Sequence, residues 1–442
     1  MAELTAREQL MLEIVNRARL DPAAEAGRLG IALNSGLNAG QISAAAKQPL
    51  APNQLLKDSA LAHSQWMIAN DIFSHTGAGG SDPGDRMTAA GYVFGGSWTW
   101  GENIAWSGTT GTPNADAYTV QLSDNLFRSP HHRVNILDDD FRELGTGIAT
   151  GGFSSGGTNY NAVMATQNFA RSGSNVFVTG VAINDADGDN FYDIGEARAG
   201  ISVSVSIGGV SAGADTTGTP GGYAVGTVGG NAGVTFSGGS LASDVSVAVY
   251  MGAKNVKIDL INDHEIASSG STVLGDGAFD LVLLGVAAIS GTGNAGDNHL
   301  TGNRGANILS GDAGQDTLTG GAGRDVLIGG TGQDIFDFNS RADSVKTASA
   351  YDVIADFERS IDVIDLSGVD ARTPRAGDQA FSWRGGAKFN GHAGQLRVVV
   401  SDKAGTGGDK TFVYGDINGD KKADFQIELS GLHHLTAGDF IL

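Results

Sequence analysis

Apolar residues in the first part of the chain recur at the spacing of an amphipathic helix. Thr5 and Glu8 form a capping box that predicts the start of this helix, and Asp21-Pro22 predicts its end. Its apolar face consists of Met11, Ile14, Val15 and Ala18. A second helix is expected over residues 53–72, where one face consists of Leu56, Ala60, His63 and Met67. The pattern predicts a compact α/β domain over residues 1–172.

From Ser174 to about Val286 the pattern changes to short alternating segments, which are typical of half-buried strands. Gly, Ser and Thr separate these segments, which include residues 176–183, 201–207 and 279–284. The prediction is therefore a small β-sandwich over residues 173–287.

A strict nine-residue period follows, with five repeats between Gly293 and Asp337. Glycine holds the first and fourth places of every repeat, where a tight turn needs a positive φ. The eighth place is always apolar and carries Leu300, Leu309, Leu318, Leu327 and Phe336. One repeat alone cannot bury that side chain, so the repeats must stack. The period predicts a parallel β-roll over residues 288–340 rather than a disordered glycine-rich linker.

The sixth place of the repeats carries polar side chains, which are Asn298, Asn307, Asp316, Asp325 and Asp334. Stacking brings these groups of neighbouring turns together, and carboxylates repel one another unless a divalent cation bridges them. We therefore predict calcium sites along this column, with calcium as part of the fold. The two asparagines are expected to weaken or remove the sites that they line. The repeat resembles the RTX nonapeptide.

Composition limits the classes of partner. The chain has 442 residues, enough for about three domains, and its net charge of −21 argues against nucleic acid or an anionic membrane. It contains no cysteine, so no disulfide supports the fold. Residues 1–20 lack the pattern of an ordinary secretory signal peptide, and no apolar run reaches the length of a membrane span.

A second acidic segment lies between the first two predicted strands of the middle domain. Positions 1, 3, 5, 9 and 12 of an EF-hand-type loop are occupied by Asp185, Asp187, Asp189, Asp193 and Glu196. Asn190 stands in the place of the usual glycine, because Asn tolerates the left-handed conformation. The spacing predicts a calcium loop without EF-hand helices. The alternative is a solvated acidic turn with no ion. The segment is similar to B-type repeat domains of bacterial surface adhesins.

Three motifs in the first domain resemble the CAP superfamily of cysteine-rich secretory, antigen 5 and pathogenesis-related proteins, in a cysteine-free form. They are Phe73-Ser74-His75-Thr76, Gly101-Glu102-Asn103-Ile104-Ala105 and the segment from Ser129 to Leu137. The resemblance covers about residues 4–170. It implies an α-β-α sandwich with a central cleft.

The same resemblance places His75, Glu102 and His132 in that cleft. Two imidazoles and one carboxylate could hold zinc or another divalent metal. The alternative is a polar network that is satisfied without a metal. The sequence departs from the family pattern at Leu126 and His131. No residue clearly matches the family's second glutamate, and Asp124 and Ser129 are the candidates near its place for a fourth ligand. His63 is expected to be a packed core histidine.

The last third of the chain resembles the C-terminal domain of serralysin-type proteins. The resemblance rests on the repeats, on the segments 352–357, 362–367 and 415–425, and on the final Asp439-Phe440-Ile441-Leu442. It implies a C-terminal β-sandwich over residues 341–442 and an uncleaved signal for type I secretion from a Gram-negative bacterium. The protease motif H-E-x-x-H is absent, because Ser268 stands where His264-Glu265 would require the second histidine.

Together these patterns favour a multidomain, secreted, extracellular calcium-binding protein. The type I secretion machinery would be one partner, and an unknown extracellular ligand of the CAP domain the other. A first alternative is a metal-dependent hydrolase acting in the CAP cleft on a peptide or ester bond, with Glu102 as general base. A second is a calcium-dependent adhesin or matrix protein. The residues favour binding over catalysis without deciding between them.

Overall fold

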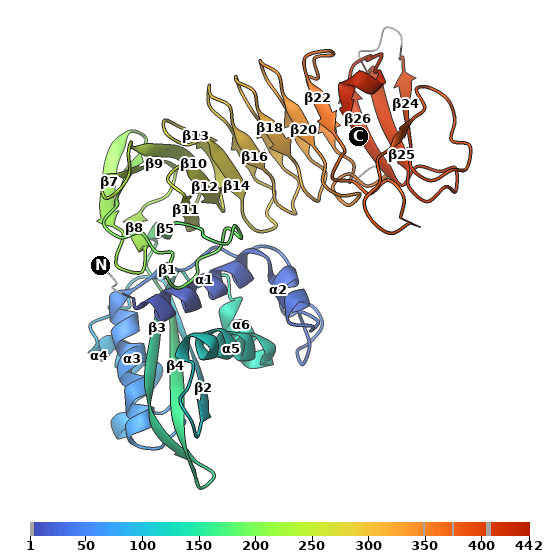
Figure 1. The fold of residues 1–442 in the computed structure, drawn as a ribbon. Coiled ribbons are helices and arrows are strands. Elements are labelled where there is room, and N and C mark those ends of the chain that lie inside the picture. Colours follow the sequence, from blue (N-terminus) through green and yellow to red (C-terminus); the bar gives the residue numbers. More distant parts are fainter. Residues whose placement is uncertain (1–3, 348–349, 374, 404–407) are drawn as a thin grey trace. The chain divides into compact units, whose positions relative to one another are not determined.

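The computed structural model describes residues 4–347, 350–373, 375–403 and 408–442. The chain divides into two compact units (Figure 1). The first consists of Met1–Val245 and Val249–Asp263, and the second of Ser246–Ala248 and His264–Leu442. The domain boundaries predicted after residues 172, 287 and 340 stay predictions.

The first unit begins with a small mixed sheet. Its strands follow the order β1-β3-β4-β2, and they are β1 (Ala51–Pro52), β2 (Trp98–Thr109), β3 (Glu143–Ser155) and β4 (Thr158–Ser172). β1 runs parallel to β3, whereas β4 is antiparallel to both β3 and β2.

Helices cover both faces of this sheet (Figure 1). One face carries α3 (Gln54–Ala69), α4 (Pro83–Ala89) and the short η1 (Ala78–Gly80). The other carries α1 (Ala6–Leu20), α2 (Pro22–Arg28), α5 (Ala115–Arg128) and α6 (Pro130–Ile136). The predicted α/β domain is thus confirmed.

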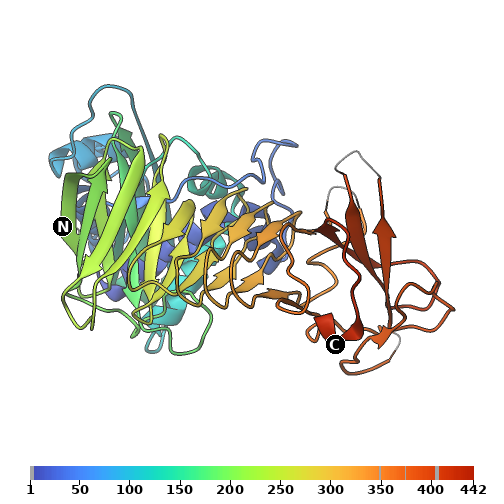
Figure 2. The ribbon, with the colours of Figure 1, turned by 90° about the horizontal axis from the view of Figure 1, so that it is seen from above.

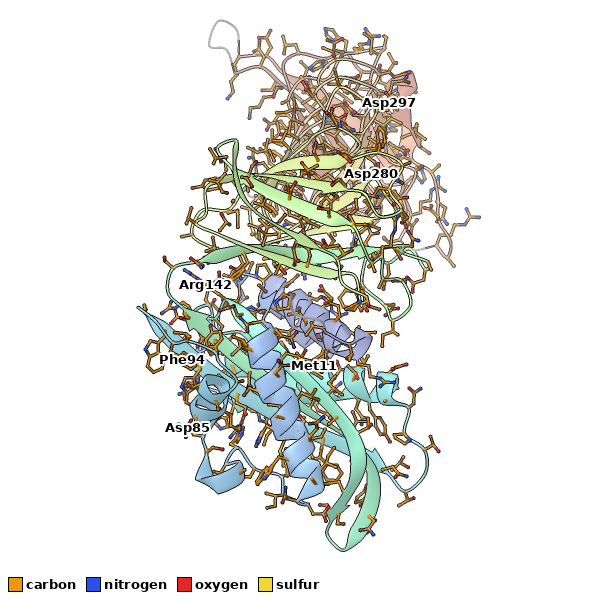
Figure 3. All side chains as sticks on the ribbon, turned by 90° about the vertical axis from the view of Figure 1, so that its left-hand side faces the viewer. Met11, Asp85, Phe94, Arg142, Asp280 and Asp297 are labelled. Atoms are coloured by element: carbon orange, nitrogen blue, oxygen red, sulfur yellow. The ribbon has the colours of Figure 1, made fainter. Side chains whose placement is uncertain are left out.

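The helix starts follow from their capping residues. In α1 the amide of Glu8 donates to Thr5 Oγ1 at 3.3 Å, and Glu8 Oε2 accepts from the amide of Thr5 at 2.8 Å. This confirms the predicted capping box. The buried Met11 of α1, labelled in Figure 3, packs with Leu122 of α5 and Val163 of β4. The apolar face of the predicted helix is therefore the face that meets the sheet.

Two glycines of β3 let α3 approach the sheet closely. A Cβ atom at Gly145 would lie 2.1 Å from the backbone of Leu56, and one at Gly147 would lie 2.1 Å from the amide nitrogen of Leu61. No side chain fits at such distances. The Gly145-Thr146-Gly147 segment is therefore set by helix-on-sheet packing.

The rest of the first unit is built of strands. They are β5 (Val176–Ile183), β6 (Ser202–Ile207), β7 (Val210–Thr216), β8 (Gly222–Thr227), β9 (Asn231–Ser237) and β11 (Val256–Ile261), while β10 (Val245–Tyr250) spans the division between the units. β6 pairs with β7 and β9, and β5 pairs with β8 and β11. The middle β-sandwich stays a prediction.

A buried ionic cluster joins α1 to β11. Lys257 Nζ lies 3.0 Å from Glu13 Oε2 and also contacts Asp259, and Gln9 Nε2 donates to Glu13 Oε1 at 2.7 Å. The Glu13, Lys257 and Asp259 side chains are each at most 7% exposed. Burial alone would lower the pKa of Lys257, but the charges of Asp259 and Glu13 raise it. The ammonium therefore stays charged inside the protein.

The second unit contains the β-roll. It starts with β12 (Glu265–Ser268), β13 (Ser271–Leu274), β14 (Asp280–Leu283) and β15 (Ser290–Thr292). The five repeats form β16 (His299–Thr301), β17 (Ile308–Ser310), β18 (Thr317–Thr319), β19 (Val326–Ile328) and β20 (Ile335–Asp337). Every strand pairs in parallel with the strand two further on (Figure 2), so one turn contains two repeats. Leu300, Leu309, Leu318, Leu327 and Phe336 are fully buried, which confirms the stacked apolar column.

The roll continues into a C-terminal region. Its strands are β21 (Val353–Ile354), β22 (Val363–Asp365), β23 (Ser382–Trp383), β24 (Gln395–Ser401), β25 (Lys410–Asp416), β26 (Phe425–Ser430) and β27 (Phe440–Ile441), with η2 at Ala437–Asp439. β24, β25 and β26 form an antiparallel meander, and β26 pairs in parallel with β21. β27 pairs in parallel with β22. The C-terminal β-sandwich stays a prediction.

We predict that Lys257→Met destabilises the protein strongly. Removing one partner of a buried ionic cluster leaves uncompensated charge and costs about 3–5 kcal/mol of unfolding free energy. The matched control is Lys254→Met, because Lys254 is 57% exposed and its ion pair with Asp139 should contribute less than about 1 kcal/mol. Denaturant unfolding in calcium compares the two variants. Equal losses would contradict a structural role for the cluster.

Candidate functional site

The predicted cleft residues His75 and Glu102 lie in direct contact. Glu102 is on β2, and its side chain is 1% exposed, whereas that of His75 is 53% exposed. Glu102 Oε1 lies 2.8 Å from His75 Nδ1. Glu102 Oε2 accepts a hydrogen bond of 2.5 Å from Arg86 Nη2 on α4. Both oxygens of this buried carboxylate are therefore engaged, one of them by a permanent cation.

The third predicted residue, His132, is half-buried on α6. Burial lowers its pKa, and the charges of His75 and His131 lower it further, so its imidazole is neutral. Within the described ranges, a convergence of three His, Asp or Glu ligand atoms within 4.8 Å occurs only at Asp185, Asp187 and Asp189. A metal held by His75, Glu102 and His132 thus stays a prediction. The Arg86 contact supports the alternative, a polar network satisfied without metal.

Amide side chains from three separate motifs form hydrogen bonds next to Glu102. Asn103 Nδ2 donates to Gln167 Oε1 at 3.1 Å and to the carbonyl of His132 at 3.2 Å. Asn135 Nδ2 donates to Asn103 Oδ1 at 2.9 Å and to the carbonyl of Glu102 at 3.2 Å. These amides fix β2 and α6 against each other and so position Glu102.

A pocket of about 450 Å³ lies beside this network, between α3 and α4. Its polar lining includes Ser59, His63 and Arg86, and Trp66 contributes an aromatic ring. The remaining apolar lining consists of the small residues Ala62, Ala78, Ala89 and Ala90. His63 is buried, stacks on Trp66 at 5.7 Å and lies 2.9 Å from the carbonyl of Ser74. Burial lowers its pKa. His63 is therefore a neutral core residue, as expected, and it also lines this pocket.

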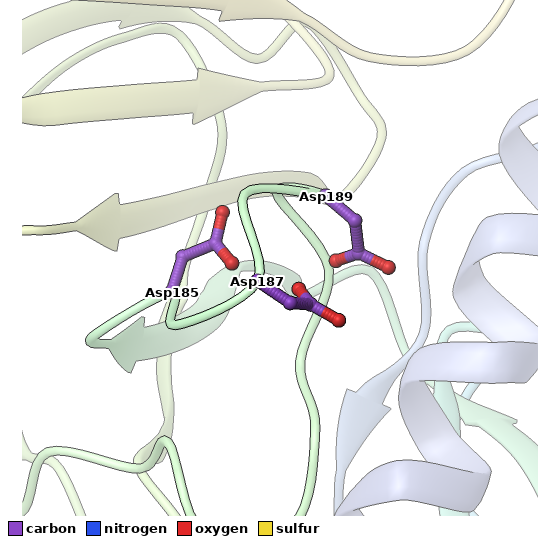
Figure 4. Close-up of side chains that lie close together, drawn as sticks. All are labelled: Asp185, Asp187 and Asp189. Atoms are coloured by element: carbon purple, nitrogen blue, oxygen red, sulfur yellow. The ribbon is translucent and has the colours of Figure 1, made fainter.

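The acidic loop of the first unit brings three of its predicted ligands together. The carboxylates of Asp185, Asp187 and Asp189 face one another (Figure 4). Asp185 accepts from the amides of Gly188 and Asn190, both at 2.9 Å. Asn190 has φ +56°, the left-handed conformation expected there. The three carboxylates are oxygen donors of the type that calcium prefers.

The end of this loop is tied to its own backbone. Glu196 Oε1 accepts from the amide of Ala186 at 2.9 Å, and Glu196 Oε2 accepts from the amide of Asp193 at 3.0 Å. Asp193 and Glu196 are not members of the group of three. Their role as calcium ligands stays a prediction.

The sixth-place side chains of the repeats form two buried columns in the second unit. Each carboxylate accepts from an amide 18 residues earlier: Asp316 from Asn298 at 2.8 Å, Asp325 from Asn307 at 2.7 Å and Asp334 from Asp316 at 3.0 Å. All five side chains are at most 3% exposed. One oxygen of each aspartate is thus fixed by the backbone of the previous turn.

Two further aspartates extend these columns beyond the repeats. Asp352 accepts from the amide of Asp325 at 2.8 Å, and Asp362 from the amide of Asp334 at 3.1 Å. Sequence reasoning missed them as site residues, because they follow the amides they bind by 27 and 28 residues rather than 18. The only available signal was their place in the acidic segments after the repeats.

The second carboxylate oxygens are compatible with calcium binding in both columns. Among the residues that the structure describes, Oδ2 of Asp316, Asp325 and Asp352 is buried and has no hydrogen-bond partner. Burial raises the pKa of these carboxyls to about 6, 7 and 9. Ionised oxygens cannot remain buried without a counter-charge, and a hard cation bound by oxygens supplies one. Asp316, Asp325 and Asp352 would therefore hold calcium, whereas both oxygens of Asp362 already accept hydrogen bonds from amides, those of Asp334 and Glu358. A calcium role for Asp334 stays a prediction.

Comparison with known families identifies a match in the N-terminal part of the chain and another in the C-terminal part. Residues 12–169 match the cysteine-rich secretory protein family, CAP, and residues 300–442 match the peptidase M10 serralysin C-terminal domain. The chain joins a CAP domain to a serralysin C-terminal domain. The resemblances to the CAP superfamily and to the serralysin C-terminal domain are thereby confirmed. A serralysin C-terminal domain is associated with type I secretion, and the combination suggests a secreted modular protein.

Solved structures resemble parts of the chain. An extracellular SCP-domain protein from Bacillus anthracis is 23% identical, covers 38% of this chain and has a TM-score of 0.24, and the chain spans 40% of its length. A subunit of the mannuronan C5-epimerase of Azotobacter vinelandii is 35% identical over 34% of this chain and 76% of its own, with a TM-score of 0.26. A second subunit of that epimerase is 31% identical over 35% and 92%, with a TM-score of 0.25. None of the curated proteins compared matches the chain.

No helix in the described part of the chain combines the length and apolar character needed to cross a bilayer.

We predict that the calcium-free roll is more stable in acid. The folded-state pKa values of Asp316 and Asp325, about 6 and 7, exceed the value of about 3.9 in an unfolded chain. The folded state therefore binds more protons, so its stability is highest below about pH 4 and falls as the pH rises through about 6–7.

Circular dichroism in chelator should thus show more β structure at about pH 5 than at about pH 8. With saturating calcium the order should reverse, because the bound form requires deprotonated ligands. A β signal in chelator that is constant over this range would contradict the prediction.

Proposed function

We propose that this protein is exported unfolded by a type I secretion system of a Gram-negative bacterium, folds on extracellular calcium, and presents its CAP domain as a ligand-binding head. The observation that carries the proposal is the buried, unpartnered Oδ2 of Asp316, Asp325 and Asp352. These atoms make the folded roll unfavourable without a cation. The serralysin C-terminal domain supports the export route.

The calcium concentration outside the cell would act as the folding signal. In a cytosol with little free calcium, repulsion and desolvation of the aspartates keep the repeats that contain them open and fit for export. Extracellular modules bind calcium with dissociation constants of about 0.1–1 mM, so the sites fill only after export.

Two features of the CAP domain support a binding role. The pocket beside Trp66 falls within the usual range of about 300–1,000 Å³ for small-molecule sites. Its lining is mostly apolar with a few polar groups, as in many ligand sites. In contrast, the carboxylate of Glu102 is neutralised by Arg86, so it is a poor general base until that contact opens.

We predict that Asp325→Asn weakens calcium-driven folding. The change removes one charged ligand, so the calcium midpoint of folding should rise at least roughly tenfold, the loss typical of removing even an outer-shell partner. The matched control is Asp276→Asn, because Asp276 is an exposed aspartate that precedes the repeats. Calcium titrations followed by circular dichroism measure both midpoints. Full β structure of the wild type in chelator at neutral pH would contradict the proposed switch.

A separate experiment distinguishes the binding head from a hydrolase. The calcium-loaded full chain is incubated with a mixed peptide library, beside His75→Ala, His132→Ala and the control His131→Ala, whose side chain is exposed. The binding proposal expects no cleavage by any of the proteins. Cleavage that is lost in the first two variants and kept in His131→Ala would instead establish the hydrolase.

A further inference from the structure

The first two repeats differ from the later ones in how their polar side chains are satisfied. Their second place carries Asn294 and Asn303, and their sixth place Asn298 and Asn307. In the next three repeats the second place is Asp312, Gly321 and Gly330, and the sixth place is aspartate throughout. An asparagine side chain contains its own N–H donors, whereas a carboxylate has only acceptors.

The second-place asparagines reach the carbonyls of the preceding turn. Asn294 Nδ2 donates to Gly275 at 2.9 Å and to Ala278 at 2.7 Å. Asn303 Nδ2 makes the same pair of bonds nine residues later, to Leu284 at 3.1 Å and Ala287 at 3.0 Å. These carbonyls are thus occupied by protein donors.

The sixth-place asparagines also donate hydrogen bonds to carbonyls of the preceding turn. Asn298 Nδ2 donates to the carbonyl of Phe279 at 3.0 Å, and Asn307 Nδ2 donates to that of Ile289 at 2.9 Å. Each also accepts a hydrogen bond from within its own repeat. Oδ1 of Asn298 accepts from the amide of Asn294 at 2.7 Å. Oδ1 of Asn307 accepts from the amide of Asn303 at 2.8 Å.

The two asparagines of a repeat are also bonded to each other. Asn298 Nδ2 lies 3.3 Å from Asn294 Oδ1, and Asn307 Nδ2 lies 3.1 Å from Asn303 Oδ1. Each repeat therefore contains a closed hydrogen-bond cluster that ties it to the previous turn. In the following repeats Asp316 and Asp325 have a buried oxygen with no partner at the corresponding place.

We infer that asparagine side chains replace calcium in the first two repeats of the β-roll, so that residues 293–310 remain folded when calcium is absent. An amide N–H supplies the positive end of a dipole where a cation would otherwise bridge the oxygens of two turns. The strands of these two repeats pair directly with β14 and β15, which precede the repeats.

This calcium-independent end is a template for the rest of the roll. The amides of Asn298 and Asn307 are oriented toward Oδ1 of Asp316 and Asp325, the first aspartates of the two columns. Calcium then has to order only the turns that follow, starting from a surface already in place. The inference rests on the proposed calcium switch and divides the roll into a permanent part and a switched part.

Amide hydrogen exchange at residue resolution on the full chain tests the inference. In chelator at neutral pH, the amides of Asn294, Gly296, Asn303 and Gly305 should stay protected, because their acceptors are asparagine side chains. Amides of the aspartate repeats, such as those of Asp316, Asp325 and Asp334, should lose their protection. In calcium all of them should be protected.

The double variant Asn298→Asp with Asn307→Asp removes the donors and adds charge at an unchanged size. Without calcium, protection of Gly296 and Gly305 should fall at least tenfold, and calcium should restore it. The matched control is Asn159→Asp, an exposed asparagine in the hairpin of the CAP domain.

Two results would overturn the inference. One is exchange of residues 293–310 in the chelated wild type as fast as that of residues 311–337. The other is protection in the chelated double variant equal to that of the wild type. Failure of calcium to protect residues 311–337 would instead refute the proposed switch, so the two failures are distinguishable.

Discussion

Negative charge that is buried inside this protein needs a partner, and the partner determines when each part can fold. In the first unit the partner is a side chain: Lys257 for Glu13 and Asp259, and Arg86 for Glu102. Those cations belong to the chain and are always present. Within the described part of the roll, Oδ2 of Asp316 and Asp325 has no hydrogen-bond partner. The same constraint is therefore met by internal cations in the first unit and, under the proposed function, would be met by an external cation in the second.

The first two repeats of the roll meet this constraint in a third way, because they carry asparagine instead of aspartate at the sixth place. The asparagines avoid the charge altogether and connect to the preceding turn through neutral hydrogen bonds. Under the proposed calcium switch, the roll would therefore run from repeats that need no ion to repeats that need one at neutral pH. Burial raises the pKa of Asp352 to about 9, further than the values of about 6 for Asp316 and about 7 for Asp325. The C-terminal meander joins the roll where the repeats end, since β21 pairs with β26.

Local patterns in the sequence were enough to predict the elements whose cause is local. The capping box of Thr5 and Glu8, the buried leucine column and the left-handed Asn190 were all correct, because each depends on residues a few positions apart. Contacts between distant residues were not predictable. Lys257 meets Glu13 although the two residues are 244 positions apart in the sequence, and Arg86 meets Glu102 from a separate helix. Asp352 and Asp362 were missed because the chain leaves the nine-residue period while the column of amides continues. For His75 and His132, motif resemblance predicted a shared cleft, and the engagement of Glu102 by Arg86 could not be seen without coordinates.

The burial of strand β27 has a consequence for the proposed export of the protein. Phe440 of β27 is 8% exposed and pairs with Ile364 of β22. The centroid of its ring lies 5.2 Å from that of Trp383. Under the proposed function, an exporter that binds this segment in an extended form could do so only before β27 pairs with β22. Folding on calcium would then bury the segment in the sheet, so that binding by the exporter and folding of this part of the chain would exclude each other.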